Sequence, residues 1–345
     1  MSYRSQRIFG TTDHPIAMHF GNDEVIRLMQ TKGIDTLSLR AAFEVSSKDG
    51  AGLREAIQNF RSREVVICTS SSALLVSHIR TDCNATEEEV THLLCERNSR
   101  WNNCSIRQLP LFTNIQHGSQ SKAQQEILCV GVEHAVIQEC TEIAEAAKLK
   151  VRRITVPVHA TLRAFDRLYR REGDEAMTSM LVDFDEKQAV AMIAHGMNLV
   201  VARSMQCTLE MQPAKKWSTS PALIPACAEQ NEFERRNCST PRGMCETQDH
   251  RNNNATTSQH SFVSELQRCM RHHSSLFPDR AIDRVVFSGT GALQTETCSS
   301  VATDLELQGF ISDPSAWIEG ADELAGGPVW TTAAGLCLAH SRQVP

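Results

Sequence analysis

The sequence predicts an α/β protein built from two related lobes. Residues 15–45 and 179–205 both read as three-stranded meanders, and they superpose at an offset of roughly 163 residues, about half the chain. Predicted strands and helices alternate between them, and a chain of 345 residues is long enough for two domains with large cores. A repeat at this distance indicates two lobes rather than a solenoid. Chance similarity of two β-meanders is the alternative.

The meanders rest on apolar–polar alternation between short turns, most of which contain glycine. Phe20 aligns with Phe184, Gly33 with Gly196, and Arg40 with Arg203. The strands expected in the first meander cover residues 15–20, 24–30 and 34–45, and those in the second cover 179–184, 188–194 and 199–205.

The elements between and after the meanders follow from periodicity and composition. Helices are expected at residues 54–60, 87–97, 133–149 and around 262–270, and strands at 64–69, 126–132 and 282–287. Residues 208–260 contain four prolines and an asparagine run, so we predict a polar, flexible insert there.

Composition excludes several classes of protein. A formal charge of −6 gives no basic face for a nucleic acid, so no nucleic-acid partner is predicted. The 13 cysteines form no C-x-x-C pair, and no metal site is predicted. Cys68, Cys129 and Cys140 lie in apolar runs as small hydrophobic residues, which suits a reducing compartment. Residues 1–14 form a tail without the apolar core of a signal peptide, so we expect a cytoplasmic protein.

Six segments, taken in order, resemble the type IV pilus assembly protein PilM family. They are "PIAMHFGNDEVIRLMQ", "LREAIQNFRSREVVICTSSSALLVSHIR", "EILCVGVEHAVIQECTEIAEAAKLKVRRITVPVHATLRAF", "LVDFDEKQAVAMIAHGMNLVVARSM", "AIDRVVFSGTGAL" and "PVWTTAAGLCLA". The resemblance implies an actin-like, ribonuclease-H-like fold with a small inserted α+β subdomain. It assigns residues 15–77 and 156–178 to the first lobe, 78–155 to the subdomain, and 179–345 to the second lobe, which carries the 208–260 insert.

The same resemblance places a nucleotide between the two lobes. In this fold, one hairpin from each lobe presents Asp-x-Gly, with Asp near magnesium and Gly near the phosphates. The corresponding candidates for ATP and magnesium are Gly21, Asn22, Asp23, Asp183, Gly289 and Gly291.

Two departures weaken the nucleotide motifs. His19 stands where the first aspartate is expected, and Asp185 stands where the second glycine is expected, followed by Glu186. Carboxylates at this position repel a phosphate. Simpler interpretations are a solvated hairpin end for Asp183 and Asp185, a packed imidazole for His19, and a plain strand-to-helix turn for Gly289 and Gly291. His272 and His273 are adjacent, so on a helix they point to different faces and are not expected to share a metal ion.

The function that these features favour is a non-catalytic scaffold in a type IV pilus-like or type II secretion-like assembly machine. By resemblance, it would bind the cytoplasmic N-terminal peptide of a single-pass inner-membrane protein, and so lie at the inner face of the membrane. The groove would lie between the first lobe and the subdomain, with walls at residues 65–69, 74–79 and 127–132. The alternatives are an ATPase that uses Asp183 and magnesium, and a filament-forming relative that self-associates.

Overall fold

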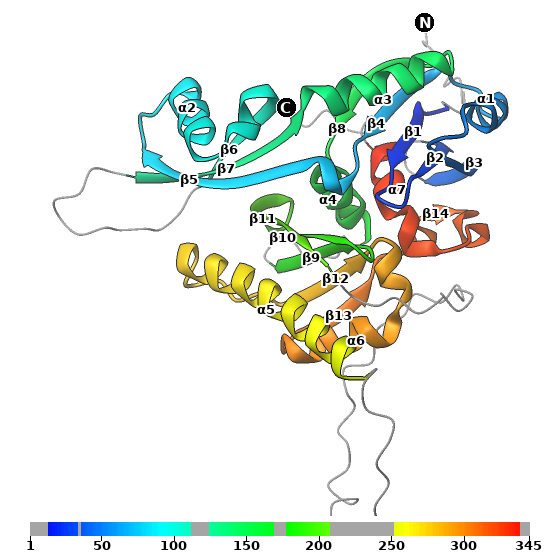
Figure 1. Cartoon of the computed structure of the whole chain (residues 1–345). Coiled ribbons are helices and arrows are strands. Elements are labelled where there is room, and N and C mark those ends of the chain that lie inside the picture. The colour runs from blue at the N-terminus through cyan, green and yellow to red at the C-terminus, as the bar shows by residue number, and fades with distance from the viewer. Residues whose placement is uncertain (1–12, 34–35, 112–123, 169–176, 208–251, 339–345) are drawn as a thin grey trace, which may run out of the picture.

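The computed structural model describes residues 13–33, 36–111, 124–168, 177–207 and 252–338. Within these ranges the chain forms three β-sheets with helices around them (Figure 1). No helix in the ranges described is long and apolar enough to cross a bilayer.

The first sheet contains the first predicted meander. Its strands, in spatial order, are β14 (Ile318–Glu319), β3 (Leu37–Ser46), β2 (Val25–Lys32), β1 (Ile16–Phe20), β4 (Glu64–Cys68) and β8 (Lys150–Thr155). β1, β2 and β3 are antiparallel neighbours, as predicted, whereas β4 and β8 extend the sheet in parallel. Side chains alternate between its faces: Ile16 and Met18 pack against α1 (Gly50–Gln58) and α3 (His134–Ala146), and Ala17 packs toward α7 (Thr331–Cys337).

The second sheet contains the second meander. Its order is β11 (Asn198–Gln206), β10 (Gln188–His195), β9 (Thr178–Phe184), β12 (Arg284–Ser288) and β13 (Gln308–Ile311). The core around it takes side chains from α4 (Pro157–Leu168) above the sheet and from α5 (Asn252–Leu276) and α6 (Thr295–Asp304) below it (Figure 1). Both predicted meanders are therefore confirmed, and the fold class is α/β.

The third sheet lies to one side of the first and is antiparallel. Its central strand, β7 (Gln124–Glu133), lies between β5 (Leu74–Asp82) and β6 (Cys104–Leu111). One face packs Leu75, Ile79 and Ile127 against α2 (Glu87–Arg97), which begins with a capping box of Thr86 and Glu89. The opposite face contributes Leu74 and Leu128 to the core of the second sheet, so this sheet has two buried faces.

The sheets divide the chain differently from the predicted boundaries. The predicted subdomain, 78–155, includes α3 and β8, but β8 pairs with β4 in the first sheet. β14, from the predicted second lobe, pairs with β3 of the first sheet, and α7 packs there too. The predicted boundaries came from the resemblance to the PilM family, whereas the sheet to which β8 and β14 belong is decided by their pairing.

The predicted insert at 208–260 is only partly within the described residues. Residues 208–251 lie outside them, so the flexibility predicted there remains a prediction. Residues 252–260 belong to α5, which corrects the end of the insert. The tail at 1–14 also lies outside, apart from its last two residues, of which Asp13 forms a β-bridge with Lys32.

The three cysteines that were expected in apolar runs lie in the core. Cys68 and Cys129 are fully buried and Cys140 is nearly so, and all three are free thiols. Burial raises the pKa of Cys129 and of Cys140 to about 12, so both are neutral and inert at neutral pH. They act as small hydrophobic side chains.

Candidate functional site

The hairpins β1–β2 and β9–β10 face each other where the first and second sheets meet. Asn22 and Asp185, which are 163 residues apart, occupy the two turns, and the amide of Asn22 donates a hydrogen bond to Oδ2 of Asp185. The separation equals the offset of the sequence repeat, so equivalent turns meet across the interface. A second contact, from the Ser72 backbone N–H to Oδ1 of Asn22 at 2.9 Å, ties in the loop after β4.

The predicted site residues gather at this junction, though in different roles. Asn22, Asp23, Asp183 and Gly289 line one small cavity together with His19 and Asp185. Gly21 and Gly291 lie beside it. A Cβ on Gly291 would be 2.2 Å from the Phe184 ring, which leaves no room for a side chain there. A Cβ on Gly21 would be 2.2 Å from Oδ1 of Asp23, the end of a side chain that can shift, so packing restricts Gly21 less.

Gly289 follows β12 with a φ of +84°, a conformation that glycine adopts without strain. A Cβ there would be 2.5 Å from the carbonyl oxygen of Phe184 and 2.8 Å from Oδ1 of Asp183. Close packing of β12 against β9 therefore explains this glycine without a ligand. The position of Gly289 at this junction is compatible with both interpretations made from the sequence, a plain turn and a nucleotide contact.

Asp183 is buried at the end of β9. Its Oδ1 accepts a hydrogen bond from Ser288 at 3.1 Å, and its Oδ2 accepts one from Ser71 at 3.4 Å. Burial raises the pKa of Asp183 to about 6, and the hydrogen bond from Ser288 only partly counters it. The simple interpretation of Asp183 as a solvated hairpin end is wrong, because only 8% of the residue is exposed.

Asp185 is held by the backbone of its own turn. Its Oδ1 accepts hydrogen bonds from the backbone N–H groups of Lys187 at 2.7 Å and Gln188 at 2.8 Å. Such successive backbone N–H groups are the donors that bind anions in phosphate sites. On the opposite hairpin, Oδ1 of Asp23 accepts the Val25 N–H at 3.3 Å. In each turn, therefore, an aspartate side chain already accepts hydrogen bonds from the backbone N–H groups that could otherwise bind an anion.

His19 is buried and uncharged. Burial, followed by the nearby Arg27 guanidinium, lowers the pKa of His19 to about 3, and its Nδ1 has no hydrogen-bond partner. A neutral imidazole cannot replace the carboxylate that would hold a magnesium shell. The environment of His19 therefore agrees with its interpretation as a packed imidazole.

Arg27, Ser71 and Ser288 belong to this junction but were not predicted from the sequence. Arg27 is buried on β2 and donates to Asp23 through both terminal nitrogens and to Glu44 through Nε at 2.9 Å. Ser71 follows β4, and Ser288 is the last residue of β12, so both lie at the carboxyl edge of parallel strands, where α/β proteins bind ligands. The run of serines after β4 is the sequence feature from which Ser71 could have been predicted as a site residue.

ATP and magnesium do not fit these residues. The cavity measures about 30 Å³, which is the share of volume of a single water molecule in the liquid, whereas ligand pockets occupy about 300 Å³ or more. Three carboxylates, those of Asp23, Asp183 and Asp185, border it against one guanidinium, that of Arg27. Opening it would break the Asn22–Asp185 contact and leave a repulsive surface for phosphate.

Comparison with known proteins gives structural relatives but no sequence relatives. No protein-family model and no curated protein matches the sequence. The structure is similar to the PilM–PilN type IV pilus biogenesis complex, with a TM-score of 0.65, 14% identity, and coverage of 95% of this chain and 99% of that chain. The chain has the actin-like fold.

Two further structures are more distant. A Bacteroides thetaiotaomicron protein with an actin-like ATPase fold and unknown function gives a TM-score of 0.47 at 12% identity, covering 90% of this chain and 93% of that one. The cytoplasmic domain of EpsL from the Vibrio cholerae type II secretion system gives 0.39 at 13%, covering 56% and 71%. At 14% identity, the similarity to the PilM–PilN complex establishes the fold and nothing finer.

Proposed function

We propose that this chain is a non-catalytic cytoplasmic scaffold of a pilus-like or type II secretion-like assembly machine, and that it binds the N-terminal cytoplasmic peptide of a membrane partner. The proposal rests on the hydrogen bonds where the two hairpins meet. Asp185 accepts hydrogen bonds from the backbone N–H groups of its own turn, and Asn22 links the two hairpins by donating to Asp185. In this proposal the chain keeps the actin-like fold but has lost the space for a nucleotide between the two hairpins. Likeness to a PilM–PilN complex supports a role in assembly.

The three segments expected to line a peptide groove differ in exposure. β4 is paired on both sides, by β1 and β8, and Val65, Val66 and Ile67 are at most 1% exposed. β7 is likewise paired on both sides, so neither strand can form a groove wall. The remaining segment, 74–79, lies on β5 at the edge of the third sheet.

β5 borders a cavity of about 600 Å³ shared with β11 and α5. Its lining combines apolar side chains such as Leu74 and Val201 with the polar side chains of Gln188 and Ser204. This volume is in the range of ligand pockets, and an extended peptide needs apolar recesses with a few polar partners. We therefore place the peptide between the third and second sheets, rather than between the first lobe and the subdomain.

Calorimetry with the N-terminal cytoplasmic peptide of a single-pass, pilin-assembly-type membrane protein encoded beside this chain tests the proposal. Micromolar binding that is unchanged by ATP is expected. Ser204→Trp fills the cavity with an indole and should weaken binding at least tenfold. Ser105→Trp is the matched control, because Ser105 is exposed on β6 and does not line the cavity. If both variants bind the peptide with equal affinity, the peptide does not bind in this cavity. If no such peptide binds the wild-type chain, the scaffold proposal is wrong.

Phosphate release from ATP is expected to stay at the no-enzyme level with magnesium present. The reasons are the neutral His19, the occupied turn donors and the 30 Å³ cavity. A malachite-green assay with Asp183→Ala as the comparison measures this. Magnesium-dependent release that Asp183→Ala abolishes would instead support the ATPase alternative.

A further inference from the structure

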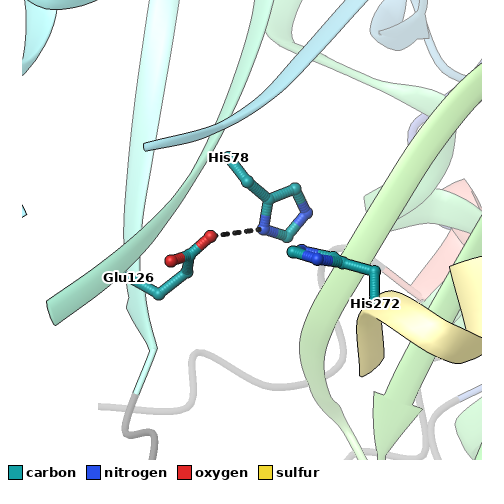
Figure 2. A group of neighbouring side chains, drawn as sticks. All are labelled: His78, Glu126 and His272. Atoms are coloured by element: carbon teal, nitrogen blue, oxygen red, sulfur yellow. Dashed lines mark ion pairs between the residues drawn. The ribbon is translucent and has the colours of Figure 1, made fainter. Parts of the chain in front are cut away.

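Three side chains from separate parts of the chain converge between the third sheet and α5: His78, Glu126 and His272 (Figure 2). One ligand atom from each lies within 4.8 Å of the others. We propose that these residues form a binding site for a divalent transition-metal ion, Zn²⁺, which links the third sheet to the helix of the second sheet. Nothing in the scaffold proposal requires this ion.

The strand register explains how two of the ligands meet. Arg80 on β5 is directly opposite Glu126 on β7, and His78 is opposite Leu128. Because side chains alternate, His78 and Glu126 share one face as diagonal neighbours. That face is the one whose Leu74 and Leu128 join the core of the second sheet. It therefore points both side chains toward α5, where His272 completes the group.

The imidazole nitrogens of this group lack the hydrogen bonds that buried polar atoms normally make. Nδ1 and Nε2 of His78 and Nε2 of His272 are buried without a partner. Leaving such a group unpaired costs about 1–3 kcal/mol. The two rings meet edge to face, with centroids 4.7 Å apart, so they do not satisfy each other. A cation between them would use these lone pairs.

The neighbouring histidine pair provides an internal contrast. His273, the next residue along α5, meets His195 of β10 with an Nε2–Nε2 distance of 2.8 Å, which joins the two rings directly. As the sequence indicated, His272 and His273 point in different directions and share no site. Nδ1 of His273 is also buried without a partner, so this pair differs from His78 and His272 only in having one direct contact between its rings.

Glu126 is the acidic member of the group and is held in place. It is 4% exposed, its Oε2 accepts a hydrogen bond from Nε of Arg80 at 3.3 Å, and its Oε1 lies 3.8 Å from Nδ1 of His78. Arg80 thus fixes one oxygen and leaves the other facing the histidines. Outer partners of this kind orient metal-binding carboxylates in known sites.

Two imidazoles and one carboxylate suit Zn²⁺ with a fourth, open position. In a tetrahedral site, ligand atoms about 2.0–2.1 Å from zinc lie roughly 3.4 Å apart, so the observed group must contract by about 1.4 Å at most. Rotamer adjustment supplies such a shift. His78 and His272 also line the 600 Å³ cavity, which gives the fourth position access to water.

The test uses the full-length chain without a histidine tag, stripped with EDTA and titrated with Zn²⁺ against a chromophoric chelator. One equivalent is expected to bind with a submicromolar Kd, and Zn²⁺ should raise the thermal midpoint. Co²⁺ should give visible absorption bands typical of four-coordinate nitrogen and oxygen ligands. His272→Gln, His78→Gln and Glu126→Gln should each weaken Zn²⁺ binding at least tenfold.

His92→Gln is the matched control, because His92 is an exposed histidine on α2 and should leave affinity unchanged. Circular dichroism of each variant without metal establishes that it is folded. If the His78→Gln/His272→Gln double variant does not fold, the Co²⁺ spectrum of the wild type decides the question. Binding weaker than about 10 µM, no such spectrum, or equal affinity of folded variants and wild type would overturn the proposal.

Discussion

Gly335→Ala is expected to lower the stability of the protein by about 3 kcal/mol, because the added methyl group has no space. Gly335 lies where α7 packs against α4, and a Cβ there would be 1.9 Å from the Ala160 carbonyl oxygen and 2.8 Å from its carbon. Both atoms are backbone, so the helices must separate. The buried hydrogen bond between Thr161 and Thr332, at 3.1 Å, would be strained as well.

The measurement is a comparison of thermal midpoints by calorimetry, with an expected fall of roughly 4 °C for a chain of 345 residues. Gly50→Ala is the control: Gly50 begins α1, and a Cβ there would approach nothing closer than an Arg54 nitrogen at 3.8 Å. That variant should change stability by less than about 1 kcal/mol, in the stabilising direction. Equal midpoints for Gly335→Ala and wild type would show that the helices do not cross at this residue.

Acid is expected to destabilise the protein steeply between pH 6.5 and 5, because the folded state keeps buried histidines neutral. The pKa is lowered to about 3 for His19 and to about 4 for His78 and for His159, in each case mainly by burial. In the unfolded chain these groups titrate near 6.5. Between the two values the unfolded state binds more protons, so stability falls as pH falls.

Asp183 acts in the opposite sense. Its pKa is raised to about 6 from 3.8, so between these values the folded state binds the extra proton, and acidification favours folding. Burial lowers the pKa of His195 and of His273 to about 4 as well. Five histidines against one aspartate leave a net uptake of about four protons on unfolding at pH 5, and at 1.36 kcal/mol per proton and pH unit the slope is about 5 kcal/mol per pH unit.

Urea denaturation at pH 7.5, 6.5, 6.0, 5.5 and 5.0, with EDTA present, measures this slope. His19→Gln should reduce it by about one proton, whereas His92→Gln, at an exposed position, should not. A flat profile between pH 6.5 and 5 would mean that these histidines are solvated in the folded protein. Carboxylates with ordinary pKa values titrate mainly below this range and do not produce the same effect.

Much of the frame could be predicted from the sequence because its signals are local. Alternation with period two marked both meanders, and helical spacing marked α2 at the bounds the structure has, Glu87–Arg97. The repeat also identified the two turns that meet. These features depend on neighbours a few residues away, or on comparison of one half of the chain with the other. His19 and Asp185 stood out as departures only against the pattern of the PilM family, which the sequence resembles.

Other features were decided only by the tertiary structure. The sequence did not show that β8 joins the first sheet, that Asp185 binds the N–H groups of its own turn, or that Asn22 closes the junction. It also gave no sign of the group formed by His78, Glu126 and His272, because sequence order does not specify which strand faces which helix. Pairing and burial are set by packing among distant segments, and burial in turn sets the charge of His19 and Asp183.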